Sequence, residues 1–333
     1  MAGYLTKQKA FRTLLNSART DSAAHSYIFE GMKGIGKFTA ARIFANAIHC
    51  TGDIKPCGEC PDCKKHSALT HSDLIIIGEG GQIKVEDIRA LNEELYIKPA
   101  LSKRKIFIVK NADNMNNDAQ NALLKSFEEP PAYAVIILLS ENVKKLLPTI
   151  RSRGTKVVFE PFAEADIKEY IERQYPLKKS SADFIALYSG GIIGRAIELC
   201  EDEEFFETRK KMFEAIATLS SDRMSIFRVA DAFGIRNGKN GFANCDVYFD
   251  LFSSFMRDVL AIKTGGRVIN EDMMPVLETF CSKVTVASVL SVIERTADVR
   301  AGLNISMKYD LWIINMLINC WEDIHGKGSR SQI

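Results

Sequence analysis

Residues 27–39 read YIFEGMKGIGKFT, a short apolar run followed by a glycine-rich loop. In this loop Gly31, Gly36 and Lys37 have the spacing of a phosphate-binding P-loop, and a helical pattern continues as far as Ile48. A strand, such a loop and a helix in this order place backbone N–H groups around an anion at the positive end of the helix. We therefore predict a nucleotide-phosphate site formed by Gly31, Gly34, Gly36, Lys37, Phe38 and Thr39. A turn that only resembles a P-loop is the weaker explanation.

The sequence around this loop fits a parallel α/β domain. Short apolar runs alternate with helical patterns over residues 1–160, and the runs beyond the first are Leu74–Ile77, Ile106–Val109, Val135–Leu139 and Val157–Phe159. Short β-branched runs separated by helices are typical of a parallel sheet that is covered on both faces. We expect one P-loop domain over this region.

The rest of the chain has helical periodicity. Residues 161–203 are predicted to form a small lid of three helices, with Gly190 and Gly191 before the last one. A larger helical domain is expected over residues 204–325, and residues 326–333 are a polar tail that we expect to be flexible.

Composition limits the protein class. The hydrophobic fraction is 46%, and no segment reaches the roughly 18 apolar residues that a membrane span needs. Met1–Ala24 lacks the apolar core of a signal peptide, so we expect a cytoplasmic protein without a membrane partner. The formal net charge of +2 provides no general attraction to nucleic acid.

Four of the eight cysteines lie within one short stretch of the chain: Cys50, Cys57, Cys60 and Cys63. Four thiolates can close a tetrahedral shell around Zn²⁺ and leave no coordination position for catalysis. Residues 56–61 read PCGECP and supply tight turns, so we predict a structural zinc module over residues 50–63. His49 and His66 flank the module, but four sulfur ligands suffice without them. A redox role for Cys57 and Cys60 is the weaker alternative.

Two departures from the P-loop pattern argue against ATP hydrolysis. The residue after the P-loop lysine normally holds magnesium through a hydroxyl, and here it is Phe38; Thr39 lies about 100° further round the helix. A neighbouring strand normally ends in acidic residues that position the metal and the attacking water. The strand Lys105–Val109 instead ends in Lys110 and Asn111. The loop is therefore expected to hold the phosphates of ATP or ADP without hydrolysing them.

The sequence resembles bacterial DNA polymerase III clamp-loader subunits, which are AAA+ proteins, along most of its length. The matching segments are residues 25–31, the P-loop, the four-cysteine module, residues 83–89, residues 121–131 and Ser152-Arg153. The segment NALLKSFEEPP at 121–131 is the most specific of them. The C-terminal third matches only as a helical region of the size of a collar domain. The resemblance implies a P-loop AAA+ domain with a zinc module, a helical lid and an all-α collar.

The resemblance also implies roles for single residues. Arg153 corresponds to an arginine finger that is offered in trans to the ATP site of an adjacent motor subunit, where it stabilises charge on the transferring phosphoryl group. Gly154 stands where the family usually has a cysteine. Arg195 is similar to the sensor arginine of the lid and is expected to lie near nucleotide, and Ser140 falls near the sensor position at the end of a strand.

The departures at Phe38, Lys110 and Asn111 favour the delta-prime type of subunit, a stator without intrinsic activity. Its implied partners are the gamma/tau motor subunits, the clamp-opening delta subunit, the sliding clamp and, through the complex, primer-template DNA. A second hypothesis is an active motor subunit of the gamma/tau type, which would show magnesium-dependent ATP hydrolysis abolished by Lys37→Ala. A third is a free-standing zinc-bearing nucleic-acid binder, and the near-neutral charge weighs against it.

Overall fold

The computed structural model describes residues 3–78, 80, 82–176, 179–235, 245–302 and 308–326. The described chain divides into two compact units. The first contains the described residues of 1–176 and 189–197, and the second contains those of 177–188 and 198–333. The division into a P-loop domain, a lid and a collar at the boundaries given above stays a prediction.

The first unit is built around a parallel sheet with the strand order β2-β3-β4-β1-β5. The strands are β1 (Ser26–Glu30), β2 (Leu74–Ile77), β3 (Lys105–Val109), β4 (Ala134–Ser140) and β5 (Thr155–Val158). Every residue of β3 and β4 is buried, which explains why these strands are continuous apolar runs in the sequence. The predicted parallel α/β fold is confirmed, with strand ends displaced by one or two residues.

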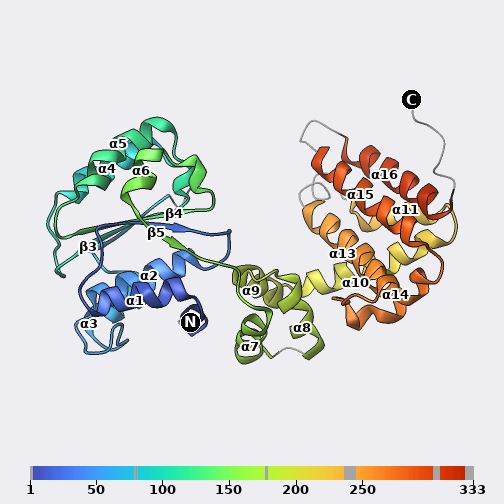
Figure 1. The fold of residues 1–333 in the computed structure, drawn as a ribbon, viewed down its shortest axis with the longest axis horizontal. Coiled ribbons are helices and arrows are strands. Elements are labelled where there is room, and N and C mark those ends of the chain that lie inside the picture. The colour runs from blue at the N-terminus through green and yellow to red at the C-terminus, as the bar shows by residue number, and fades with distance from the viewer. Residues whose placement is uncertain are drawn as a thin grey trace. The chain divides into compact units, whose positions relative to one another are not determined.

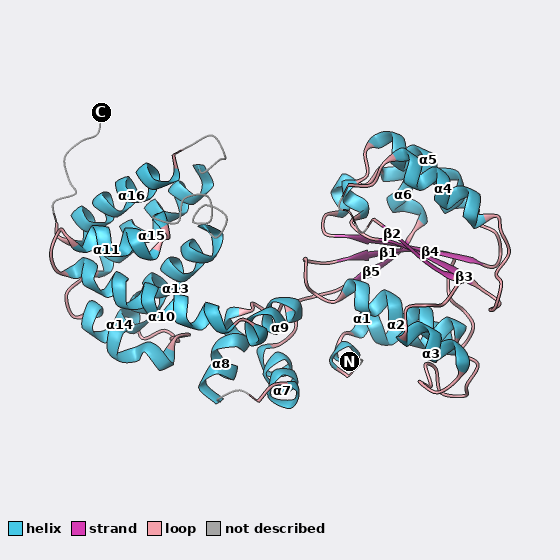
Figure 2. Ribbon diagram, turned by 180° about the vertical axis from the view of Figure 1, so that it is seen from behind, coloured by secondary structure: helices cyan, strands magenta, loops and turns pink. Residues whose placement is uncertain are grey.

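Helices cover both faces of the sheet (Figures 1 and 2). One face carries α1 (Lys9–Arg19), α2 (Lys37–His49) and α3 (Pro61–Ser67). The other carries α4 (Val85–Leu95), α5 (Asn117–Glu128) and α6 (Pro148–Arg153). The short 3₁₀ helices of this unit are η1 (Tyr4–Lys7), η2 (Ala112–Asn114) and η3 (Val143–Lys145). The chain continues through β5 into α7 (Glu164–Gln174), and α9 (Ile193–Glu201) begins in this unit.

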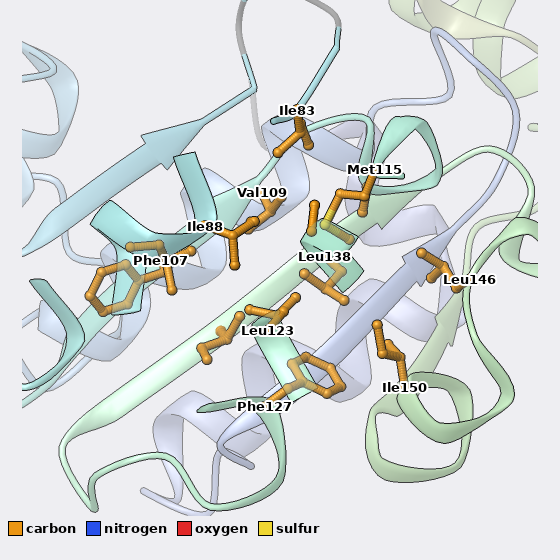
Figure 3. Close-up of a cluster of buried hydrophobic side chains, with 14 of the residues drawn as sticks. Ile83, Ile88, Phe107, Val109, Met115, Leu123, Phe127, Leu138, Leu146 and Ile150 are labelled. Carbon is orange, nitrogen blue, oxygen red and sulfur yellow. The ribbon is translucent and has the colours of Figure 1, made fainter. Parts of the chain in front are cut away.

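A buried apolar cluster joins the sheet to α4, α5 and α6 (Figure 3). Its members include Phe107 and Val109 of β3, Leu138 of β4, Ile88 of α4, Leu123 and Phe127 of α5, and Ile150 of α6. Burying each large apolar side chain stabilises the fold by about 1.5–3 kcal/mol. The cluster therefore fixes the ends of α5 and α6, where Glu128 and Arg153 lie.

In its described part, the second unit is helical. Its helices are α8 (Lys179–Tyr188), α10 (Glu203–Ala217), α11 (Ser225–Ala232), α13 (Cys245–Thr264), α14 (Met274–Cys281), α15 (Val286–Gly302) and α16 (Tyr309–Ile324), with the 3₁₀ turns η4 (Thr218–Ser220) and η6 (Glu271–Met273). Phe255 is fully buried in this unit, and its ring centroid lies 5.1 Å from that of Phe213 and 5.3 Å from that of Phe280. The helical C-terminal region predicted from the sequence is confirmed.

Buried polar groups also contribute to the second unit. The Arg209 guanidinium donates to both carboxylate oxygens of Asp272, at 2.9 and 2.6 Å, and lies 3.9 Å from the ring centroid of Phe184. Within the described ranges, no single helix has the length and hydropathy of a membrane span; only the bent pair Glu271–Cys281 and Val286–Gly302 meets that test jointly.

Candidate functional site

The P-loop connects β1 to α2, as its sequence predicts. Gly34 and Gly36 have φ values of +77° and +99°, in the left-handed region that favours glycine. Gly31 has a different reason to be glycine, because a Cβ atom there would lie 2.9 Å from the carbonyl oxygen of Phe159. The loop can therefore adopt this conformation only with glycines at these positions.

Lys37 is turned back onto the loop. Its Nζ donates to the carbonyl oxygens of Gly31 at 2.5 Å and Met32 at 2.9 Å. Burial lowers the pKa of Lys37, and the nearby carboxylates of Glu141 and Asp113 partly oppose this shift. When a phosphate group binds here, its oxygen atoms must replace these two carbonyl oxygens as acceptors for the Lys37 ammonium group.

A cavity of about 310 Å³ lies beside the loop. Its lining includes Lys33, Lys37 and Lys110, with Glu141 as the carboxylate among them. A volume of this order is at the lower end of the range for small-molecule sites, about 300–1,000 Å³. The cavity is the candidate nucleotide site.

The start of α9 closes one side of this cavity. The Gly194 N–H donates to the Gly34 carbonyl at 2.8 Å, and a Cβ atom at Gly194 would lie 2.8 Å from that oxygen. Ile193, Gly194 and Ile197 belong to the lining, whereas the described lining does not include Arg195. Ser140 is buried at the end of β4, and its hydroxyl has no hydrogen-bond partner among the described residues. A nucleotide role for Arg195 or Ser140 stays a prediction.

Phe38 and Lys110 contact each other across the cavity. Lys110 Nζ lies 4.5 Å from the centroid of the Phe38 ring, within the range of a cation–π interaction. The Arg42 guanidinium lies 5.9 Å from the same ring. Thr39 hydrogen-bonds the Tyr4 side chain, which lowers the pKa of Tyr4 against the larger raising effect of burial. Phe38 and Lys110 therefore provide an aromatic ring and an ammonium group where magnesium needs oxygen ligands.

The four cysteines of the predicted zinc module come together. Their sulfur atoms lie within 4.8 Å of one another, with Cys57 Sγ 3.8 Å from Cys63 Sγ and Cys60 Sγ 4.0 Å from Cys50 Sγ. A zinc ion with Zn–S bonds of about 2.3 Å places its tetrahedral ligands about 3.8 Å apart. This geometry fits a structural Zn²⁺ site.

Backbone donors support negative charge on these sulfur atoms. The N–H groups of Gly52 and Cys57 donate to Cys50 Sγ at 3.4 and 3.3 Å, and the Cys63 N–H donates to Cys60 Sγ at 3.4 Å. Burial raises the pKa of Cys60, but hydrogen bonds from the Cys63 and Thr51 backbone outweigh it and lower that pKa to about 6. Burial raises the pKa of Cys50, and it raises that of Cys63 to about 12, so a bound cation is needed to hold all four sulfur atoms as thiolates, the form that binds metal.

A buried group of three histidines lies next to the module and joins His49 and His66, which the sequence places beside the cysteines, with His71. The His49 and His66 ring nitrogens are 2.8 Å apart, and the His49 and His71 rings stack at 4.3 Å. His49 Nε2 faces the Arg104 carbonyl at 3.0 Å, which assigns it as a donor, so Nδ1 accepts from His66. Burial lowers the pKa of His49 to about 3 and that of His66 to about 4.

These contacts favour a neutral, hydrogen-bonded structural group over a metal site. A tetrahedral metal with M–N bonds of about 2.1 Å separates two ligand nitrogens by about 3.4 Å, more than the 2.8 Å between His49 and His66. His71 accepts from the Asp73 N–H at 3.2 Å and so links the group to the start of β2. No local pattern could have predicted this group, because its members come from three separate elements.

Arg153 lies at the surface at the end of α6. Its side chain is 40% exposed, its Nε is paired with the Glu128 carboxylate, and its Nη1 donates to the Thr149 carbonyl at 3.0 Å. Nη2 has no hydrogen-bond partner in the part of the chain that the structure describes. The guanidinium is thus oriented by α5 and α6 while one edge remains accessible.

Comparison with known proteins agrees with these features. The family model for the DNA polymerase III delta subunit matches residues 6–163. DNA polymerase III subunit delta-prime of Bacillus subtilis is 29% identical over 309 residues, which are 89% of this chain and 92% of that protein. Subunit tau/gamma of Haemophilus influenzae is 31% identical over 172 residues, 51% of this chain but only 25% of that protein.

Solved structures show lower similarity to this chain. A gamma subunit-related protein of Thermotoga maritima is 21% identical, with a TM-score of 0.43 over 95% of this chain and 99% of that one. The clamp loader delta protein of Bacillus subtilis is 13% identical, with a TM-score of 0.37 over 94% and 99%.

The parallel sheet, the P-loop and the adjoining helices define a P-loop α/β protein. The sequence matches are more specific than the fold. The chain is similar to bacterial DNA polymerase III subunits, and the match to a delta-prime subunit extends over most of both chains. The gamma/tau hypothesis is less well supported, because the tau/gamma match covers half of this chain.

Proposed function

We propose that this chain is the non-hydrolysing delta-prime subunit of a DNA polymerase III clamp loader. The observation that carries the proposal is the contact between Lys110 Nζ and the Phe38 ring, at 4.5 Å from its centroid. Hydrolysis by a P-loop protein needs a hydroxyl and a carboxylate that hold magnesium at these two places. A chain with this pair can keep phosphate at its loop, but it cannot assemble that metal site.

The same chain is proposed to serve a neighbouring ATP site through Arg153. An arginine finger must be exposed and oriented before the partner arrives, since ordering it afterwards costs binding energy. The exposed side chain and its contacts with Glu128 and Thr149 support this role. Glu128 would be a positioning residue, because it acts on the ATP site only through Arg153.

The proposed assembly follows from this role. Its partners are the gamma/tau motor subunits, the delta subunit and the sliding clamp, with primer-template DNA contacted through the complex. The helical second unit is proposed to be the collar that joins the subunits, and Zn²⁺ is proposed to stabilise the cysteine module. A replication factor of this kind acts in the cytoplasm.

The test is the Arg153→Ala variant in a loader reconstituted with motor subunits, delta, clamp and primed DNA. Removing an arginine finger lowers the rate at the site it serves by about 10³–10⁵. We therefore expect the steady-state rate of ATP hydrolysis to fall by the contribution of one motor site, while gel filtration shows an assembled loader.

Lys156→Ala is the matched control, because it removes another half-exposed cation from the neighbouring strand β5. It should leave both assembly and hydrolysis unchanged. An assembled Arg153→Ala loader that hydrolyses ATP at the wild-type rate would remove the finger role.

A further inference from the structure

The end of β3 places a positive charge beside the P-loop. Lys110 follows Val109, the last residue of β3, and its N–H continues the ladder with β2 by donating to the Ile77 carbonyl at 2.8 Å. Its backbone is closely packed, since a Cβ atom at Gly78 would lie 2.5 Å from the Lys110 carbonyl oxygen. The sheet therefore determines where the side chain of Lys110 starts.

The Phe38 ring contacts the end of that side chain. Phe38 is the second residue of α2, and its ring lies 4.5 Å from Lys110 Nζ. In a P-loop ATPase the residue at this position contributes the hydroxyl that holds Mg²⁺. The ammonium group of Lys110 thus lies beside the position that the metal ion occupies in such enzymes, in contact with the face of an aromatic ring.

We propose that Lys110 substitutes for the magnesium ion, so that this P-loop binds a nucleoside di- or triphosphate without a divalent cation. The inference rests on the proposed function in one respect, the loss of hydrolysis at this site. It adds the kind of ligand that the site takes and the residue that decides it.

The charges of the cavity support this ligand class. Lys33, Lys37 and Lys110 line it together with one carboxylate, Glu141. Three ammonium groups can neutralise much of the charge of a diphosphate. In P-loop ATPases one lysine and Mg²⁺ together provide this neutralisation. A magnesium ion would meet repulsion from Lys110 and find no oxygen ligand on Phe38. Magnesium that binds the nucleotide in solution should therefore weaken the binding of the nucleotide to this site instead of assisting it.

The experiment is calorimetric titration of the full chain with ADP, in EDTA and in excess Mg²⁺. We expect saturable binding in EDTA that is equal to or tighter than binding in Mg²⁺. Lys110→Met should weaken binding in EDTA at least tenfold, and Lys110→Arg should restore most of it because the charge returns. The double variant Phe38→Thr/Lys110→Asp should reverse the pattern and bind ADP more tightly with Mg²⁺ than without it.

Lys103→Met is the matched control, because Lys103 is exposed and precedes the opposite end of the same strand. It should bind ADP as the wild type does, and circular dichroism should show that every variant is folded. The inference is overturned if the folded wild type does not bind ADP, if binding requires Mg²⁺, or if Lys110→Met binds normally. None of these results bears on Arg153, whose contribution is measured at the site of another subunit.

Discussion

Gly154 lies between the exposed Arg153 and strand β5, and its backbone has ordinary dihedral angles, φ −86° and ψ 137°. The requirement for glycine is therefore one of space. A Cβ atom at this position would lie 2.6 Å from Ile28 Cγ1 and 3.0 Å from Phe127 Cζ. In this chain the close packing of α6 against β1 and α5 leaves no room for a side chain at this position.

We expect Gly154→Ala to destabilise the first unit by about 1–3 kcal/mol, the usual cost of forcing an extra carbon into a packed core. The free energy of unfolding from urea titration measures the effect. Gly3→Ala is the control, because a Cβ atom at Gly3 has no heavy atom within 4 Å. An unchanged free energy for Gly154→Ala would mean that Ile28 and Phe127 move aside without cost.

Single residues could be predicted from the sequence where they stand at fixed places in a motif. Phe38 and Lys110 are recognised as departures from a P-loop ATPase for this reason. Their contact could not be predicted, because it depends on the position of β3 two strands away from β1, with β4 between them. The pairing of Arg153 with Glu128 is beyond sequence analysis for the same reason, since it joins the ends of two different helices.

At the level of elements, the cysteine module was predictable because all its ligands lie in one short segment. Its connection to the sheet was not predictable. The histidine group links the end of α2, helix α3 and the residues before β2, so the module is attached to the domain by buried hydrogen bonds as well as by the chain.

We expect one Zn²⁺ per chain, and its loss on Cys60→Ser substitution or on chelation. Without the ion, the sulfur atoms lose the bonds that hold them together, so residues 50–67 should unfold locally and the chain should become cleavable by trypsin at Lys64 and Lys65. Metal analysis and limited proteolysis with mass spectrometry measure both effects.

Cys200→Ser is the control for this experiment, because Cys200 lies outside the module in α9. It should retain zinc and resist trypsin at these sites. A Cys60→Ser protein that keeps a full equivalent of zinc would show that the ion is bound elsewhere.

At the level of the whole molecule, the strands were the most predictable feature, since parallel strands buried on both faces leave continuous apolar runs. The division into two units was harder to see. Helix α7 belongs to the first unit and α8 to the second, although both are short helices in one continuous helical stretch of sequence. Local periodicity shows that a helix forms but not which core it joins.

Because each unit buries its own apolar core, we expect urea to unfold the chain in more than one transition. The two tryptophans provide a selective probe, since Trp312 and Trp321 both lie in α16 of the second unit. Leu123→Ala creates a cavity in the first unit and should cost about 2–5 kcal/mol there. Phe255→Ala should cost about 3–5 kcal/mol in the second.

Tryptophan fluorescence and far-ultraviolet circular dichroism distinguish these effects. Leu123→Ala should lower the midpoint of the dichroism transition that has no counterpart in fluorescence and leave the fluorescence midpoint in place, because no tryptophan reports on the first unit. Phe255→Ala should move the fluorescence midpoint. If both substitutions shift the fluorescence transition equally, the chain unfolds as one cooperative body, and the two cores stabilise each other despite being built from separate sets of residues.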